Sequence, residues 1–184
     1  SEQATRGARS SRYQLPKMGD ARADYLLSWF PADVLRDLER LRMSLEKLGD
    51  HPRTILLALA SNLLRDYSLQ DPEDLRIRRR KSPLPTTPFF DAFEAACANF
   101  CAKLSDSQQT LGVRETDSKA VLADCRELAP HPALPAHNFD LALTRPPYAP
   151  ALPYIDTQRR SLVWLGLVSA SELLALDSPL FGSR

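Results

Sequence analysis

Hydrophobic side chains recur at helical spacing through the first half of the chain. The first such pattern follows Pro31, a residue that suits a first helical position, and ends at Gly49. A second helix is expected from about Pro52 to Asp66, and because it is apolar on most sides we place it in the core. A third is expected from about Pro88 to Leu104, with one apolar face formed by Phe89, Phe93, Cys97, Phe100 and Leu104.

Charged residues at helical spacing lie on the face of the first helix opposite its leucines. The expected pairs on this face are Asp37–Arg40, Glu39–Arg42 and Arg42–Glu46.

The pattern changes after residues 105–117, which are expected to be a polar connection. Residues 120–123 form a short apolar run that ends at Asp124, consistent with a strand, and residues 139–143 show the pattern of a short buried strand. A helix is expected over 153–167 and a short one over 169–176. Three helices followed by two strands with a crossover predict an α/β domain that carries a helical insertion.

This order of elements divides the chain into three parts. We expect a flexible basic tail at 1–22, a helical region with a basic loop at 23–117 and a partial α/β region at 118–184. Residues 1–20 are polar and are expected to be disordered or loosely docked.

The composition is that of a soluble globular protein, with 43% hydrophobic and 26% charged residues. The net charge is +1, so any affinity for nucleic acid must come from local clustering of charge. No apolar run approaches the ~18–20 residues of a membrane span. The cysteines do not form a disulfide framework, which favours a reduced, cytoplasmic setting, and the scattered histidines predict no metal site.

Only six glycines occur, and no Gly-x-Gly pair is among them. Such a pair normally allows a backbone loop to approach a nucleotide or S-adenosylmethionine. We expect no loop of this kind within these residues.

Residues 144–148 read Thr-Arg-Pro-Pro-Tyr, and the two prolines end the preceding strand abruptly. A strand followed by this turn resembles the (Asp/Asn/Ser)-Pro-Pro-(Tyr/Phe/Trp) motif of DNA methyltransferases that modify an exocyclic amino group. Residues 154–158 and 162–166 look like the continuation of that motif in one bacterial branch of the family, and the block at 71–81 is a second match. The resemblance covers about residues 25–184.

The resemblance implies an incomplete Rossmann-like methyltransferase sheet with a helix-rich N-terminal or inserted region. It also implies S-adenosylmethionine-dependent methylation of adenine or cytosine in DNA, as in restriction-modification systems. Tyr148 would stack on the flipped base, and the main-chain carbonyl of Pro146, within the rigid turn completed by Pro147, would accept an amino hydrogen. Arg145 stands where the family has an acceptor, and arginine is a donor only.

Asp124 resembles the strand-end acidic residue that lies near the cofactor adenine in this family, while its other interpretation is an aspartate that makes a turn. In this branch the glycine loop for the cofactor usually precedes the helical segment. The chain therefore resembles the middle and catalytic part, and we expect it to be inactive without a second chain that carries the cofactor-binding half.

A run of cations precedes the third helix: Arg76, Arg78, Arg79, Arg80 and Lys81. It is the best candidate for contact with DNA phosphates, and Arg159 and Arg160 could extend the patch. The other interpretation is a solvated loop, or pairing with the nearby acidic residues Asp71, Glu73 and Asp74.

Two functions therefore stay open at this point. One is an incomplete or split DNA amino-methyltransferase. The other is a pseudoenzyme, a non-catalytic nucleic-acid-binding or protein-interaction module derived from such an enzyme.

Overall fold

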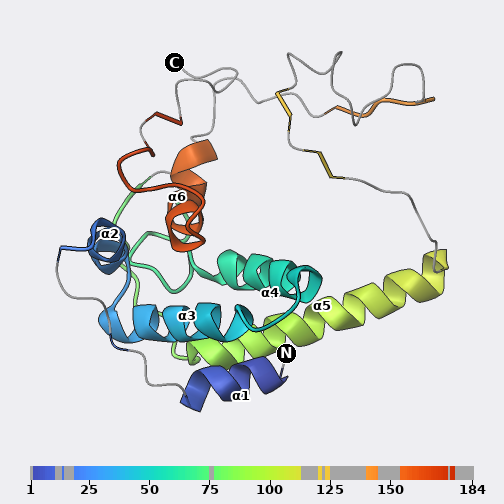
Figure 1. Ribbon diagram of the computed structural model, residues 1–184, viewed down its shortest axis with the longest axis horizontal. Helices are drawn as coiled ribbons and strands as arrows, with labels where there is room; N and C mark the ends of the chain where they lie inside the picture. Colours follow the sequence, from blue (N-terminus) through green and yellow to red (C-terminus); the bar gives the residue numbers. More distant parts are fainter. Residues whose placement is uncertain are drawn as a thin grey trace.

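The computed structural model describes residues 2–10, 14, 19–74, 77–112, 120–121, 123–124, 140–144, 154–173 and 175–176. Within these residues the regular structure is helical: α1 Glu2–Ser10, α2 Ala21–Trp29, α3 Ala32–Leu45, α4 Asp50–Leu63, α5 Phe89–Leu111 and α6 Tyr154–Trp164. Figure 1 shows their arrangement. None of the described helices has the length and apolar character needed to cross a bilayer.

Helix α3 is the centre of the core and contacts α1, α2, α4 and α5. Its leucines at 35, 38, 41 and 45 are all fully buried. The period of about 3.6 residues places these side chains along one stripe, as the sequence predicts. The helix expected between Pro31 and Gly49 is confirmed.

Helix α5 begins in an aromatic cluster and then runs beyond the ends of α3 and α4 (Figure 1). Phe89 packs edge-on against Tyr67 at 5.5 Å between ring centroids, and Phe93 is fully buried. The helix continues to Leu111, so the expected polar connection at 105–117 is wrong over its first residues. Uncharged polar side chains are compatible with a helix that is exposed all round, and polarity alone therefore did not mark its end.

Helix α4 is less buried than its apolar sequence predicts. Ala60 is its only fully buried residue, and Ile55 is 44% exposed. The helix packs against α3 and α5 and leaves its other side open. The helix expected from about Pro52 to Asp66 is therefore present, and one of its faces packs against the core while the other is exposed.

Residues 2–10, expected to be disordered or loosely docked, form α1. Small side chains explain this difference, because Thr5 and Ala8 are fully buried where α1 lies against α3 and α5. Arg9 also pairs with Asp91 on α5. The polar composition of this segment therefore gave no indication of a helix that packs through small residues.

The expected α/β Rossmann-like sheet is contradicted. The described residues contain only one isolated antiparallel bridge, between Gln70 and Arg79. A strand was expected at 139–143, but its described residues, 140–143, form no strand pairing with other described residues. Leu141 and Leu143 are 73% and 91% exposed. A short apolar run becomes a buried strand only where neighbouring strands complete its hydrogen bonds, and none of the described residues forms such a neighbour.

Helix α6 confirms the helix expected over 153–167. Val163 and Trp164 are fully buried, as expected of a tryptophan core anchor. The helix ends at Trp164, and Gly166 follows it with a left-handed φ of +73°. The Leu167 amide donates back to the Leu162 carbonyl at 2.9 Å. The short helix expected at 169–176 is a series of turns where it is described.

A buried carboxylate joins α2, α3 and α6. Glu39 of α3 accepts from Arg22 at 2.8 Å and from Arg42 at 3.2 Å. Arg22 also donates to the carbonyls of Val163 and Trp164, the last residues of α6. The expected Glu39–Arg42 pair is therefore present, but Glu39 lies inside the fold and contributes to holding α6 in place.

Candidate nucleic-acid interface

The basic loop is attached to the helical body by main-chain hydrogen bonds. The Leu69 amide donates to the Trp29 carbonyl at 2.7 Å, at the end of α2. The returning segment, residues 78–80, then pairs with this one: the Asp71 amide donates to the Arg78 carbonyl, and the Arg80 amide to the Leu69 carbonyl, each at 2.9 Å. Residues 78–80 are therefore held in an extended conformation beside the end of α2.

The cations of this loop differ in what they contact. Arg78 pairs with Asp74 at 3.0 Å, and its side chain is still 63% exposed. Arg80 donates to the carbonyls of Asp66 and Ser68, at 2.6 and 3.0 Å, so its guanidinium largely supports the loop itself. Lys81 is exposed. Arg76 lies outside the described residues.

Trp29 connects this loop to α6. The guanidinium carbon of Arg79 lies 4.4 Å from the centroid of the Trp29 ring, and that of Arg160 lies 5.6 Å from it. Arg79 also donates to the Ser28 carbonyl. Trp29 packs against the core but is only partly buried, and two arginines meet at its ring.

The two arginines of α6 have different environments. Arg159 pairs with Asp156, one turn earlier, at 2.8 Å. Arg160 is only 2% exposed. Burial lowers the pKa of Arg160 to about 10, and the positive charges of Arg65 and Arg159 act in the same direction. Arg160 is therefore a buried member of a cationic cluster, formed with Arg65 and Arg159, rather than an exposed extension of the basic loop.

Tyr25 lies within electrostatic range of the same cluster. Burial raises the pKa of its phenol, while the charges of Arg160 and Arg159 oppose that shift. The phenol therefore stays protonated at neutral pH and keeps an O–H donor beside the cationic cluster.

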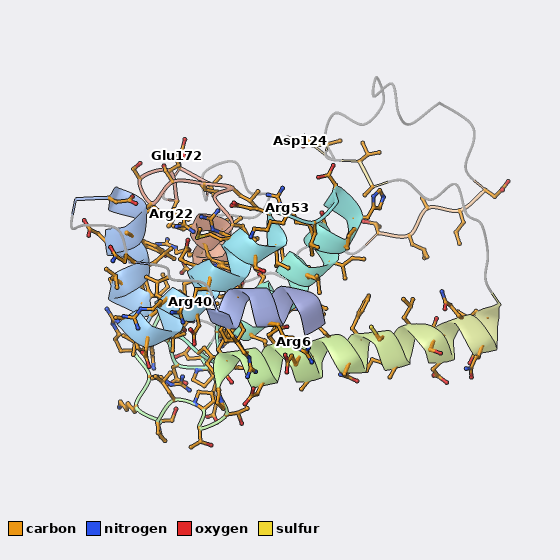
Figure 2. All side chains as sticks on the ribbon, turned by 60° about the horizontal axis from the view of Figure 1, so that its bottom comes forward. Arg6, Arg22, Arg40, Arg53, Asp124 and Glu172 are labelled. Carbon is orange, nitrogen blue, oxygen red and sulfur yellow. The ribbon has the colours of Figure 1, made fainter. Side chains whose placement is uncertain are left out.

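The residues expected to hold the base and the cofactor are only partly visible. Arg145, Pro146, Pro147 and Tyr148 lie outside the described residues. Asp124 is described, is exposed and lies in a segment with no regular structure (Figure 2). An exposed carboxylate with no strand end or glycine loop among the described residues around it does not make a cradle for S-adenosylmethionine, so these residues do not fit that cofactor.

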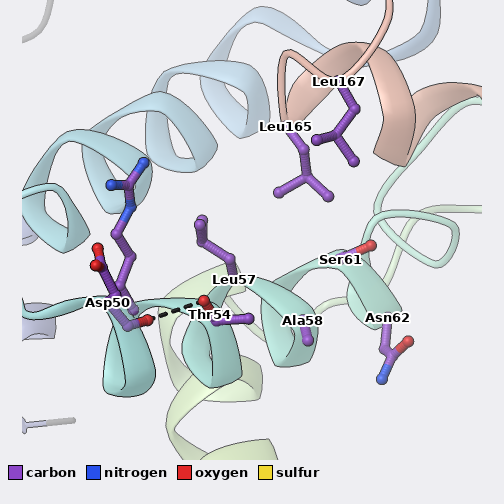
Figure 3. A pocket seen from close by; sticks show the side chains of 9 residues that line it. Asp50, Thr54, Leu57, Ala58, Ser61, Asn62, Leu165 and Leu167 are labelled. Atoms are coloured by element: carbon purple, nitrogen blue, oxygen red, sulfur yellow. Dashed lines mark hydrogen bonds between the residues drawn. The ribbon is translucent and has the colours of Figure 1, made fainter. Parts of the chain in front are cut away.

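An open groove of about 530 Å³ lies on the exposed side of α4 (Figure 3). Leu57 and Ala58 of α4 and Leu165 and Leu167 beyond α6 form its apolar walls. Further residues that line it are Asp50, Arg53, Thr54, Ser61 and Asn62. The Thr54 hydroxyl donates to the Asp50 carbonyl at 2.8 Å, so it serves the helix itself. The lining contains no pair of groups suited to acid–base or nucleophilic chemistry.

Within the described part of the chain, no group of three or more His, Cys, Asp or Glu side chains is placed to hold a metal ion. Cys97 is buried, as expected of a structural thiol, whereas Cys101 is exposed. The helix extends away from the core at that point, which the periodic pattern did not reveal.

Comparisons with protein-family models, curated proteins and solved structures return no match for this chain. The resemblance to DNA amino-methyltransferases therefore depends on the sequence motifs alone.

Proposed function

We propose that this chain binds DNA through the basic surface around Trp29, and that it is the DNA-contacting helical part of a DNA amino-methyltransferase. One observation carries the proposal. The block at 71–81 and the segments 154–158 and 162–166 each resemble the methyltransferase family, and the block meets α6 at the Trp29 ring through Arg79 and Arg160. Segments that recur together in one family and also form one surface are expected to share one task.

The charges of this surface suit a phosphate backbone. Arg78 and Lys81 present exposed cations, and Arg79 is oriented by its stacking on Trp29. Stacking fixes the plane of a guanidinium while its outer N–H groups stay available for phosphate oxygens. Because such contacts recognise the backbone, we expect binding to depend weakly on sequence and strongly on salt.

Methylation requires more than this surface. The described residues do not fit S-adenosylmethionine, so the cofactor would have to be bound elsewhere, as in a second chain with the cofactor-binding half. Arg145 also provides no acceptor for the substrate amino group.

A second candidate function is a non-catalytic DNA-binding module derived from such an enzyme. The exposure of Leu141 and Leu143 favours it, because the segment that leads to the Pro-Pro-Tyr turn is not buried in a catalytic sheet. Both candidates use the same DNA-binding surface and differ only in catalysis.

DNA binding is tested by fluorescence anisotropy with a labelled duplex over a range of salt concentrations. Replacing Arg78 and Lys81 together by alanine should weaken binding and lower the slope of log K against log salt by about 1.8, or about 0.9 for each lost phosphate contact. The matched control replaces Lys47 and Lys103, which are exposed cations on other parts of the fold. Equal affinity and slope in both double variants would reject the proposed surface.

Catalysis is tested with a tritiated methyl donor. The chain is assayed alone, with a partner chain that contains the family's glycine loop, and as the Arg145→Ser variant with that partner. Transfer by the variant with its partner supports the methyltransferase, and absence of transfer in all three supports the non-catalytic module.

A further inference from the structure

Arg160 is a buried cation that forms no ion pair within the part of the chain that the structure describes. It is 2% exposed, and its Nη2 has no hydrogen-bond acceptor among the described residues. The guanidinium carbon lies over the Trp29 ring, 5.6 Å from its centroid. An ionised group removed from water is costly unless an opposite charge and hydrogen bonds replace the lost solvent. Within the described residues the charge of Arg160 is therefore incompletely compensated, and a bound anion would compensate it.

The surroundings add positive charge rather than removing it. Arg65 and Arg159 both act on Arg160 as like charges. Arg65 Nη2 donates to the Asp74 carbonyl at 2.7 Å, whereas its buried Nε has no acceptor among the described residues. The nearby carboxylate, Asp156, already forms an ion pair with Arg159 at 2.8 Å. Among the described residues, the carboxylate that acts on Arg160 is therefore already engaged with another arginine.

We propose that Arg160, together with Arg65, binds one phosphate oxyanion beside Trp29. A guanidinium presents two parallel N–H donors that match two oxygens of a phosphate. The guanidinium carbon of Arg160 lies 5.6 Å from the centroid of the Trp29 ring, and the neutral Tyr25 phenol offers a further donor close to the same cluster. Because Arg160 itself is buried, binding requires the partly buried Trp29 side chain to move aside and admit a phosphate oxygen.

The assignment of the phosphate to the DNA backbone rests on the proposed function. The oxyanion chemistry rests on Arg160 and its neighbours alone. The two parts are therefore tested separately, with inorganic phosphate and with duplex DNA.

The first experiment measures the thermal unfolding of the full chain in sodium phosphate and in sodium chloride at equal ionic strength. Phosphate should raise the Tm of the wild-type chain by roughly 3 °C more than chloride does. Arg160→Gln should lose this increment, and the control Lys103→Gln should keep it. An equal increment in Arg160→Gln would indicate the general stabilising effect of phosphate on proteins and would overturn the site. No increment in the wild-type chain would overturn it as well.

Arg160→Lys provides a second variant if the glutamine variant does not fold. It keeps the charge and most of the side-chain length but lacks the planar pair of donors. It should lose most of the phosphate increment, and retention of the full increment would overturn the bidentate site.

The second experiment identifies the source of the phosphate. DNA affinity should fall by about tenfold in Arg160→Lys, the size of one charged hydrogen bond, and inorganic phosphate should compete with DNA for the wild-type chain. Loss of the phosphate increment with unchanged DNA affinity would keep the oxyanion site and overturn its assignment to the DNA backbone. The exposed-cation variants Arg78→Ala and Lys81→Ala test the proposed function independently of this site.

Discussion

Replacing Glu39 by glutamine removes the negative charge that joins α2, α3 and α6. The carboxylate is 2% exposed and accepts from Arg22 at 2.8 Å and from Arg42 at 3.2 Å. Arg22 in turn donates to the final carbonyls of α6. The substitution keeps the shape of the side chain, so its main effect is to leave two arginines without their shared counter-charge.

The magnitude follows from the burial of the three groups. Removing one partner of a buried ion pair costs about 3–5 kcal/mol. Here the arginine side chains remain 28% and 32% exposed, and water compensates for part of the loss. We therefore expect the free energy of unfolding to fall by about 2–3 kcal/mol, which corresponds to a decrease in Tm of roughly 5–10 °C for a chain of this size.

The measurement is urea denaturation followed by circular dichroism, with Glu46→Gln as the matched control. Glu46 also pairs with Arg42 at 3.2 Å, but its side chain is 49% exposed, so its replacement should cost less than about 1 kcal/mol. The double variant Arg22→Gln with Glu39→Gln should cost less than the sum of the single changes by about 1 kcal/mol or more. Equal losses for Glu39→Gln and Glu46→Gln would refute the assignment of a buried, shared charge.

Three further predictions concern the helix end, the thiols and the response to pH. Gly166→Ala should reduce the free energy of unfolding by about 1–2 kcal/mol because φ is +73°, whereas Gly49→Ala, at a φ of −62°, should be nearly neutral in the same denaturation assay. Burial raises the pKa of the Cys97 thiol, so timed alkylation at pH 8 with peptide mapping should label exposed Cys101 much faster, and equal rates would contradict the packing of α5. Burial also raises the pKa of Tyr25 above its ordinary 10.0, so the folded chain holds this proton more tightly than the unfolded chain. The resulting stability is complete below pH 10 and is lost as the pH rises through the raised pKa. Tyr25→Phe should reduce this decline without abolishing it, because burial raises the pKa of Tyr67 as well.

The sequence predicted the helices whose apolar residues repeat at one clear period. Leu35, Leu38 and Leu41 define α3 because local spacing and burial agree there, and Phe89 and Phe93 begin α5 in the same way. These are local patterns, and they need no knowledge of the partner segment.

The errors arose where burial depends on segments that are distant in the sequence. A run such as Leu141 to Leu143 has the composition of a strand, but only neighbouring strands could have made it one. Polar α1 docks through the small residues Thr5 and Ala8, and charged Glu39 is buried because arginines from two helices surround it. Periodicity reports the hydrophobicity of a position and not the partners that a polar residue will meet.

The candidate site was predicted in part for the same reason. The run of cations is visible in the sequence, but the meeting of Arg79 and Arg160 at Trp29 is a tertiary contact. The adjacent arginines Arg159 and Arg160 indicated positive charge on α6. Their spacing did not indicate that Arg160 would be buried, or that its Nη2 would lack an acceptor among the described residues.

The central claim is that the basic loop, the end of α2 and α6 form one DNA-binding surface. Amide hydrogen exchange with mass spectrometry, with and without a duplex at low salt, tests it most directly. We predict that DNA protects residues 26–32, 77–82 and 157–162 together and leaves the exposed half of α5, residues 101–111, unchanged. Protection confined to α5, or no protection near Trp29 under conditions where DNA is bound, would contradict the account.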